Sequence, residues 1–362
     1  MSPSFTDALR FDINHNVTIF LEGHKGVLMA ITLKDIAELL GVSVNTVSRA
    51  LKDKSDISEK TRLRVKEAAS ALGYRPNLNA RSLVLKKTHT VGLAVTESDN
   101  PVRMEFCEKL RSFAARDGYR ILTVSLDHAW SSGNFLAIED LLARRVDGLI
   151  LGAIWGLIGE QPLGEQLKTC RKNGIPVVLF GQAQTELADC VEIDKADSAT
   201  RLTRHLIERG YRKITFFENN PASLVLKGYR QTMETIGLAD GLRIVQDYSG
   251  RMDVAFAVME KFLKTEKELP DAVIASNDLG AIGFLAALRK HHISVPQQCA
   301  VAGFDNIVFG QYTEPPLTTI GYDNGLFSET VWNMMIRRLR NEETGPAKRE
   351  RILQTLIVRQ ST

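Results

Sequence analysis

Residues 32–51 are the stretch that most constrains what this chain can fold into. They read TLKDIAELLGVSVNTVSRAL, with apolar residues at helical spacing on both sides of Gly41. Ala37 is small enough for two helices to approach closely, and Gly41 provides the residue without Cβ that a left-handed helix end requires. Ser43 is a suitable N-cap for a second helix. The spacing therefore predicts two short helices joined by a tight turn.

The two sides of this helix pair differ in chemistry. The side chains that we expect to face a core are apolar: Ile36, Leu39, Leu40, Val44, Val47 and Leu51. The outward side of the second helix carries short polar or cationic groups: Asn45, Thr46, Ser48 and Arg49. An ordinary helical hairpin inside a core has no need of such a face. The spacing and the polar face are typical of a helix-turn-helix, whose second helix enters the DNA major groove.

Positive charge is concentrated around this motif. The 362-residue chain has a formal net charge of +3, but residues 31–90 contain twelve Lys and Arg residues against six Asp and Glu residues. The remainder of the chain is therefore net negative. Neutralisation of DNA phosphates requires such an excess of positive charge, although an ordinary solvated charged face could also produce it.

A third helix is expected to complete a small headpiece over residues 31–75. Ser58 is its predicted N-cap, and Gly73 is predicted to end it. Its buried side is expected to consist of Leu63, Val65, Ala68, Ala69 and Leu72. Three helices of this size enclose only a small core, so we expect the headpiece to be marginally stable alone.

The segments that flank the headpiece carry weaker patterns. Residues 1–30 lack a clear period, helix caps and a secretory signal, so we expect a flexible extension or an incorrectly assigned start. Residues 76–88 begin with a proline and form either a plain linker or a short hinge helix, too brief to be stable alone. In the second case the hinge folds on DNA, and Leu83 enters the minor groove as an apolar wedge.

From residue 89 the sequence alternates between β and α segments. The first series has strands at 91–95, 121–125, 148–151 and 177–180, and helices at 102–117, 134–145 and 163–173. The second has strands at 191–193, 214–217, 272–275 and 300–304, and helices at 196–209, 223–236, 252–265 and 278–290. Near-continuous apolar strands indicate parallel sheets, so residues 89–362 are expected to form two doubly wound α/β subdomains.

A closing segment, from 315–320 through a helix to 353–358, is expected to return across both subdomains. In sheets of this kind ligands bind beyond the carboxyl ends of the strands. We therefore expect a ligand site between the two subdomains.

Several classes of protein are disfavoured by what the sequence lacks. No apolar run approaches eighteen residues, so no membrane span or membrane partner is expected. The four cysteines lie far apart without metal-ligand spacing, which favours free thiols in a reducing compartment such as the cytoplasm: Cys107, Cys170, Cys190 and Cys299. No catalytic grouping or phosphate-binding glycine loop appears, so we expect neither an enzyme nor a metal or cofactor. A solute-binding protein of a transport system is the main alternative, but it would carry an export signal and no headpiece.

Eight short motifs resemble the LacI/GalR family of transcriptional repressors, from about residue 31 to the end of the chain. They are LKDIA at 33–37, VSVNTVSR at 42–49, GYRPN at 73–77, VDGLI at 146–150, GIPV at 174–177, SND at 276–278, GFD at 303–305 and PLTT at 316–319. Each is weak alone, but the set is specific.

The resemblance implies a homodimer that binds a pseudo-palindromic operator in double-stranded DNA. Val44 and Asn45 would begin base recognition, and Arg49 would read a base further along, since Asn pairs with adenine and Arg with guanine. Phosphate contacts are implied for Thr32, Leu33, Ser43, Thr46, Ser48, Ser58 and Thr61. Hinge contacts beside Leu83 are implied for Asn77 and Ala80.

The resemblance also implies an effector site between two lobes of the periplasmic-binding-protein type. Asn277 and Asp305 match positions that hydrogen-bond sugar hydroxyls in the family, and Tyr248 lies where an aromatic ring often stacks on the ligand. We therefore expect a repressor of carbohydrate or related catabolic genes whose operator affinity depends on a sugar or related metabolite. Closure of the lobes on the ligand would change the spacing of the paired hinges.

The effector site departs from the family pattern at three positions. Val225 replaces an arginine, Gly181 an aspartate and Val102 an aromatic residue. Charged hydrogen bonds are worth roughly 1.5–3 kcal/mol each. Their loss implies a smaller or less hydroxylated effector, or compensation by other residues. The residues available are Asp99, Asn100, Arg103, Trp155 and Lys227, although Trp155 and Tyr248 can equally be core residues.

Replacing Leu83 by alanine tests the wedge. If the leucine enters the minor groove, Leu83→Ala weakens binding to the operator more than binding to non-specific DNA, because only the specific complex inserts it. Gel-shift titrations on both DNAs measure the two losses. Equal losses would show that no wedge is inserted.

Overall fold

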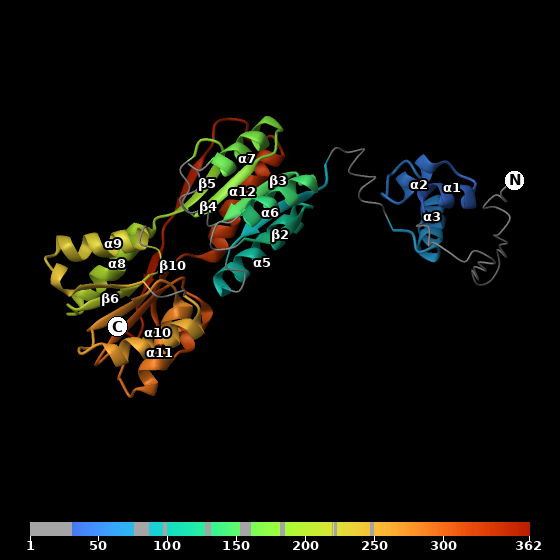
Figure 1. The fold of residues 1–362 in the computed structure, drawn as a ribbon. Coiled ribbons are helices and arrows are strands. Elements are labelled where there is room, and N and C mark those ends of the chain that lie inside the picture. The colour runs from blue at the N-terminus through green and yellow to red at the C-terminus, as the bar shows by residue number, and fades with distance from the viewer. Residues whose placement is uncertain are drawn as a thin grey trace. The chain divides into compact units, whose positions relative to one another are not determined.

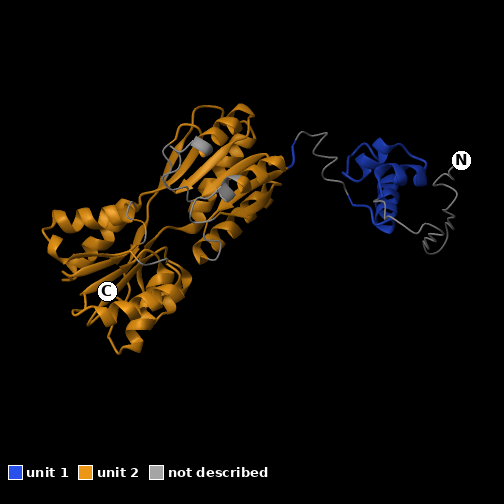
Figure 2. Cartoon of the chain, in the orientation of Figure 1, with its two compact units in different colours: residues 1–88 blue, residues 89–362 orange. Residues whose placement is uncertain are grey.

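The chain is organised as two compact units. The computed structural model describes residues 31–75, 87–96, 100–126, 132–152, 161–181, 185–218, 220, 223–246 and 250–362. The contacts within the chain divide it into one unit of residues 1–88 and another of residues 89–362 (Figure 2). Residues 31–75 of the first unit are called the headpiece below.

The headpiece consists of three helices (Figure 1): α1 (Leu33–Leu40), α2 (Val44–Ala50) and α3 (Glu59–Ala71). All three pack around one small core of buried apolar residues: Ile36, Ala37, Val47, Ala50, Val65 and Ala69. The residues at these positions are alanine, valine or isoleucine, so the helices can approach one another closely.

The turn between α1 and α2 has the predicted chemistry. Gly41 has a φ of 65°, and the backbone N–H of Val42 donates to the carbonyl of Ala37 at 3.0 Å. This pattern closes the helix because the left-handed residue turns the last carbonyls toward the following amides. Ser43 Oγ accepts from the backbone N–H of Thr46 at 3.0 Å and starts α2.

Two headpiece residues that were predicted to be buried are exposed. Val44 is 45% exposed because it is the first residue of α2, and the core begins one turn later at Val47. Leu63 is 54% exposed. It lies two residues before Val65, about 200° around the axis of α3, and so points away from the core.

The second unit contains two six-stranded sheets. The first has the order β11-β5-β4-β3-β1-β2 and is parallel throughout: β1 (Thr90–Val95), β2 (Arg120–Ser125), β3 (Gly148–Gly152), β4 (Val177–Gly181), β5 (Asp189–Ile193) and β11 (Arg349–Ile352). The second has the order β12-β10-β9-β8-β6-β7: β6 (Ile214–Phe217), β7 (Leu242–Val245), β8 (Ala272–Ala275), β9 (Ala300–Phe304), β10 (Thr318–Gly321) and β12 (Thr355–Ile357). Only β12 runs antiparallel to its neighbour in this sheet.

Helices cover both faces of each sheet (Figure 1). Each sheet with its helices is called a lobe. In the first lobe α5 (Pro101–Arg116) and α12 (Asn324–Leu339) share one apolar cluster with the sheet, and α6 (Ser132–Ala143) and α7 (Gln161–Lys172) share a second cluster on the other face. In the second lobe α8 (Lys195–Glu208) and α9 (Leu224–Thr235) lie opposite α10 (Met252–Thr265) and α11 (Asp278–Lys290). Burial on both faces explains why the strands are near-continuous apolar runs.

The predicted grouping of the strands was wrong in one respect. The strand near 191–193 was assigned to the second series, but β5 pairs with β4 in the first sheet. The chain enters the second lobe only after β5, returns to the first with α12, and crosses again between β11 and β12. The edge strand β7 was not predicted, because it has four residues and is only partly buried.

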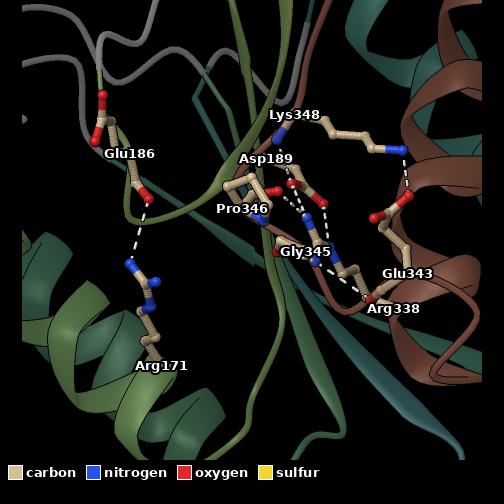
Figure 3. A network of polar contacts seen from close by, with 8 residues as sticks. All are labelled: Arg171, Glu186, Asp189, Arg338, Glu343, Gly345, Pro346 and Lys348. Carbon is tan, nitrogen blue, oxygen red and sulfur yellow. Dashed lines mark hydrogen bonds and ion pairs between the residues drawn. The ribbon is translucent and has the colours of Figure 1, made fainter.

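A buried ion pair fixes the turn before the last crossing (Figure 3). Arg338 of α12 donates to Asp189 of β5 through Nη2 at 2.7 Å and Nε at 2.8 Å. Arg338 also donates to the carbonyls of Gly345 and Pro346, at 2.8 Å each, and the backbone N–H of Lys348 donates to Asp189 at 2.8 Å. One guanidinium and one carboxylate thus hold α12, β5 and the start of β11 together.

Arg338→Ala is expected to lower the free energy of unfolding by about 3–5 kcal/mol, because it leaves the buried charge of Asp189 unpaired. Urea denaturation followed by circular dichroism measures the change. Arg144→Ala is the control, since its pair with Asp140 lies on the surface and should contribute about 0–1 kcal/mol. Similar losses in both variants would contradict the structural role of Arg338.

Candidate DNA-binding and effector sites

The predicted phosphate-contacting hydroxyls other than Ser48 lie at the starts of the three headpiece helices. Thr32 caps α1, the Ser43 hydroxyl contacts that of Thr46 at 2.8 Å, and the Ser58 hydroxyl contacts that of Thr61 at 2.9 Å. Unpaired N–H groups and the positive end of the helix dipole favour anions at such positions. The start of α1 is the least suited, because the carboxylate of Asp35 already accepts from Thr32 there.

The predicted base-reading residues lie on α2 and are accessible. Val44 and Asn45 are exposed at the beginning of the helix, and Arg49 is partly exposed further along. Ser48, a predicted phosphate contact, is partly exposed beside Arg49. Leu33, the remaining predicted contact, is half-buried at the first position of α1. The structure therefore brings the predicted contacts to accessible positions, and their contacts with DNA stay predictions.

Two exposed carboxylates follow α2 in the loop that leads to α3. Asp56 pairs with Arg49, and Asp53 pairs with Lys66 at 2.6 Å and with Arg62 at 3.8 Å. These hydrogen bonds lower the pKa of both carboxyls, so both stay charged at neutral pH. The loop after α2 is thus tied to α2 at one end and to α3 at the other.

The carboxyl ends of the two sheets meet in the second unit. Asn100, which caps α5 after β1, donates from Nδ2 to Asp305 Oδ2, just after β9, at 3.3 Å. Arg103 of α5 lies 5.5 Å from the ring centroid of Phe180 at the end of β4. The predicted effector residues Asn100, Arg103 and Asp305 therefore lie near the same meeting point of the lobes.

Asn277 lies at the end of β8 in the second lobe. Its Oδ1 accepts from the backbone N–H of Gly280 at 2.8 Å and caps α11. Gly250 packs against its amide: with a φ of 76°, any Cβ there would lie 2.6 Å from Asn277 Nδ2. A glycine at 250 is therefore required both by the backbone and by the close approach.

Asp278, the neighbour of Asn277, has a structural role. It is fully buried and accepts from Thr319 Oγ1 at 2.6 Å and from the backbone N–H of Ile307 at 2.9 Å. Burial and, secondarily, the negative charge of Asp305 raise the pKa of Asp278 well above its ordinary value. The two hydrogen bonds that Asp278 accepts hold the turn after β9, where Asp305 has an unusual φ of 108°.

Two residues of this region were not predicted. Phe180 fits only because the facing residue at the end of β3 is Gly152, where a Cβ would lie 1.9 Å from the ring. Asn324, at the crossing into α12, donates from Nδ2 to the carbonyl of Val102 at 2.9 Å. Its buried Oδ1 has no donor among the residues that the structure describes. Neither residue carries a local signal, because only the fold brings each of them to its partner.

Sequence comparisons agree with this architecture. Residues 32–77 match the family described as bacterial regulatory proteins, lacI family, and residues 203–362 match the periplasmic binding protein-like domain. The ribose operon repressor of Escherichia coli K12 is 32% identical over 317 residues, which cover 85% of this chain and 93% of the relative. The transcriptional repressor PurR of Vibrio campbellii is 30% identical, with coverage of 86% and 93%. The chain belongs to the LacI family.

Solved structures of LacI-family proteins share the fold. A Lac repressor dimer bound to operator and an anti-inducer superposes with a TM-score of 0.79 at 23% identity, covering 92% of this chain and 99% of that one. A LacI-family regulator from Enterococcus faecium with bound ribose has a TM-score of 0.66 at 20% identity, with coverage of 75% and 98%. At these identities the likeness concerns the fold.

The positions where this LacI-family chain departs from the family pattern differ in setting. Val225 is 7% exposed and packs in the apolar core of α8, α9 and the second sheet. Gly181 is buried at the end of β4 with a φ of 107°. Val102 is 7% exposed and packs in the apolar cluster that α5 and α12 share with the first sheet. Lys227, which was predicted as a compensating residue, is exposed on α9. The valine at 225 thus behaves as a core residue, and an effector contact from it stays a prediction.

Some predicted site residues lie outside the described part of the chain: Asn77, Ala80, Leu83, Asp99, Trp155 and Tyr248. Within the described part, no helix is both long and apolar enough to cross a membrane. No group of three or more His, Cys, Asp or Glu residues suited to a metal ion occurs in that part either. All four cysteines are buried, and none of them forms a disulfide.

Proposed function

We propose that this protein is a cytoplasmic repressor that binds a pseudo-palindromic operator as a homodimer and responds to a small molecule held between its two lobes. The observation that carries the proposal is a combination. The accessible face of α2 belongs to a unit with its own core, and the same chain contains a two-lobed unit. The relatives are named as transcriptional repressors rather than enzymes. A catalytic role is therefore not proposed.

Base reading is assigned to the start and the outward side of α2. Asn45 can pair with adenine through its amide, and Val44 offers an apolar contact to a thymine methyl. Arg49 can pair with guanine at the far end of the helix. The hydroxyls of Thr32, Ser43 and Ser58, with the N–H groups beside them, serve phosphates and set the register of α2.

Asn45→Ala tests this assignment. A bidentate contact to a base contributes about 1–3 kcal/mol of discrimination, so we expect operator affinity to fall roughly 5- to 150-fold, with little change on non-specific DNA. Gel-shift titration at fixed salt on a selected operator and on unrelated DNA measures both. A uniform loss on both DNAs would indicate that Asn45 only contacts the backbone.

The proposed effector is a sugar or a related metabolite. The ribose operon repressor and the ribose-bound regulator motivate ribose as the first candidate, and a cellobiose complex of a regulator with 26% identity and a TM-score of 0.64, covering 92% of this chain and 100% of that one, motivates cellobiose as the second. Asn100, Asn277 and Arg103 supply donors, and Asp305 supplies a charged acceptor. Hydroxyl groups both donate and accept, so a polyol suits this set.

Effector binding is proposed to act through the three crossings that join the lobes. The hydrogen bond from Asn100 to Asp305 spans the lobes, so a ligand that replaces or strengthens it changes their relative free energy. If the hinge that ends at residue 88 is positioned differently in the open and closed forms, the same ligand changes operator affinity. Operator binding then changes ligand affinity by the same coupling free energy.

Asp305→Asn tests the effector site. The asparagine can still accept from Asn100 but removes the charge, so effector affinity should fall roughly 10- to 150-fold, the loss of a charged hydrogen bond. Operator affinity without effector is measured as well, because the same hydrogen bond spans the lobes. Calorimetric titration with ribose and with cellobiose measures the first, and gel shift the second.

Asp240→Asn is the matched control, because Asp240 is an exposed carboxylate of the same lobe. If both variants bind the effector as tightly as the natural protein, Asp305 is not an effector ligand. If a ligand binds tightly but leaves operator affinity unchanged, the coupling is absent.

A further inference from the structure

Arg49 and Asp56 form a forked ion pair on the surface of the headpiece. Arg49 lies in the last turn of α2, and Asp56 lies in the loop before α3. Nε of Arg49 donates to Oδ2 of Asp56 at 2.8 Å, and Nη2 pairs with Oδ1 at 2.7 Å. The two side chains are 42% and 53% exposed, so solvent or DNA can reach both.

The pairing uses only one edge of the guanidinium. Five N–H groups are available on an arginine, and Asp56 accepts the Nε–H and forms an ion pair with Nη2. Among the residues that the structure describes, the guanidinium of Arg49 makes no other hydrogen bond, so Nη1 on the outer edge, formed by Nη1 and Nη2, is not engaged. This outer edge is the one that pairs bidentately with O6 and N7 of guanine.

Holding an arginine in this way has a thermodynamic consequence. A free arginine side chain loses much of its rotamer entropy when it binds. A hydrogen bond and an ion pair to one carboxylate fix the plane of the guanidinium before DNA arrives, so less entropy is lost on base contact. The hydrogen bonds also raise the pKa of Arg49, and its charge is secure at any ordinary pH.

A carboxylate at this position is otherwise unfavourable in a DNA-binding protein. Asp56 lies in the loop directly after the proposed recognition helix, and its charge repels phosphates and weakens non-specific binding. Asp53 lies in the same loop, but its carboxylate pairs with Lys66 and Arg62 of α3 and not with Arg49. The two carboxylates therefore have equal charge and different partners.

We propose that Asp56 is a positioning residue for base specificity: it holds the side chain of Arg49 so that the outer edge of the guanidinium faces a guanine of the operator. The inference rests on the proposed function, since it requires that α2 enters the major groove. In the complex Asp56 keeps its hydrogen bond and its ion pair with Arg49, while Nη1 and Nη2 contact the base.

The experiment compares base preference in matched variants of the full-length chain. An operator is first selected from a randomised DNA library, and the guanine whose preference disappears in Arg49→Ala is identified. Affinities are then measured for this operator, for versions with that guanine replaced, and for unrelated DNA. The variants are Asp56→Asn and Asp53→Asn, each of which removes one negative charge from the same loop.

Both asparagine variants should bind unrelated DNA more tightly by a similar factor, because each removes one charge that repels phosphates. Only Asp56→Asn should lower the preference for guanine, roughly 3- to 10-fold, a part of the discrimination that a full bidentate contact supplies. In the Arg49→Ala background, Asp56→Asn should leave base preference unchanged. This last result separates positioning of Arg49 from a direct contact of Asp56 with DNA.

An unchanged guanine preference in Asp56→Asn would overturn the positioning role. So would a sharper preference, which would mean that Asp56 masks Arg49 instead of presenting it. If the natural protein selects an operator but Arg49→Ala loses no preference, the inference fails and the proposed function stands. If the natural protein selects no operator at all, the proposed function itself fails.

Discussion

The chain passes between the two lobes three times, and the rest of the second unit depends on this connectivity. The crossings lie at 193–195, 321–324 and 352–355. The first and third are tied together, because buried Ser198 donates to Gln354 at 2.6 Å and Arg351 pairs with Asp194 at 3.3 Å. The lobes can therefore turn about a shared set of short connections but cannot separate. The ion pair of Arg338 holds the segment that leads into the third crossing.

Local features of the fold were predictable from the sequence, and long-range partners were not. Gly41 and Ser43 determine their turn through their own backbone and side chain, so the helix-turn-helix follows from a few neighbouring residues. Most strands and helices of the second unit follow from apolar periodicity. The sheet to which β5 belongs depends instead on pairing with distant β11. Exposure of Val44 and Leu63 depends on where a six-residue core ends, which helical spacing alone does not specify.

The effector site was predictable only through family resemblance, and its chemistry emerges from the fold. Asn100 and Asn277 follow strands of different sheets, and each uses Oδ1 to cap the next helix, at 3.0 Å from Val102 N and 2.8 Å from Gly280 N. Capping leaves the amide hydrogens as their remaining polar groups. The amide of Asn100 donates to Asp305, and the amide of Asn277 lies beside Gly250. Sequence spacing cannot show this, because the amide of an isolated asparagine can either donate or accept a hydrogen bond.

The interleaved connectivity also sets the order in which the protein can be completed during synthesis. Nearly all of the second lobe, residues 195–321, is inserted within the first lobe, whose sheet lacks its covering helix α12 and its edge strand β11 until residue 352 is made. The headpiece is complete at residue 75. At typical rates of translation, on the order of tens of seconds separate these two points. A nascent chain therefore carries a finished helix-turn-helix before the unit proposed to regulate it has formed.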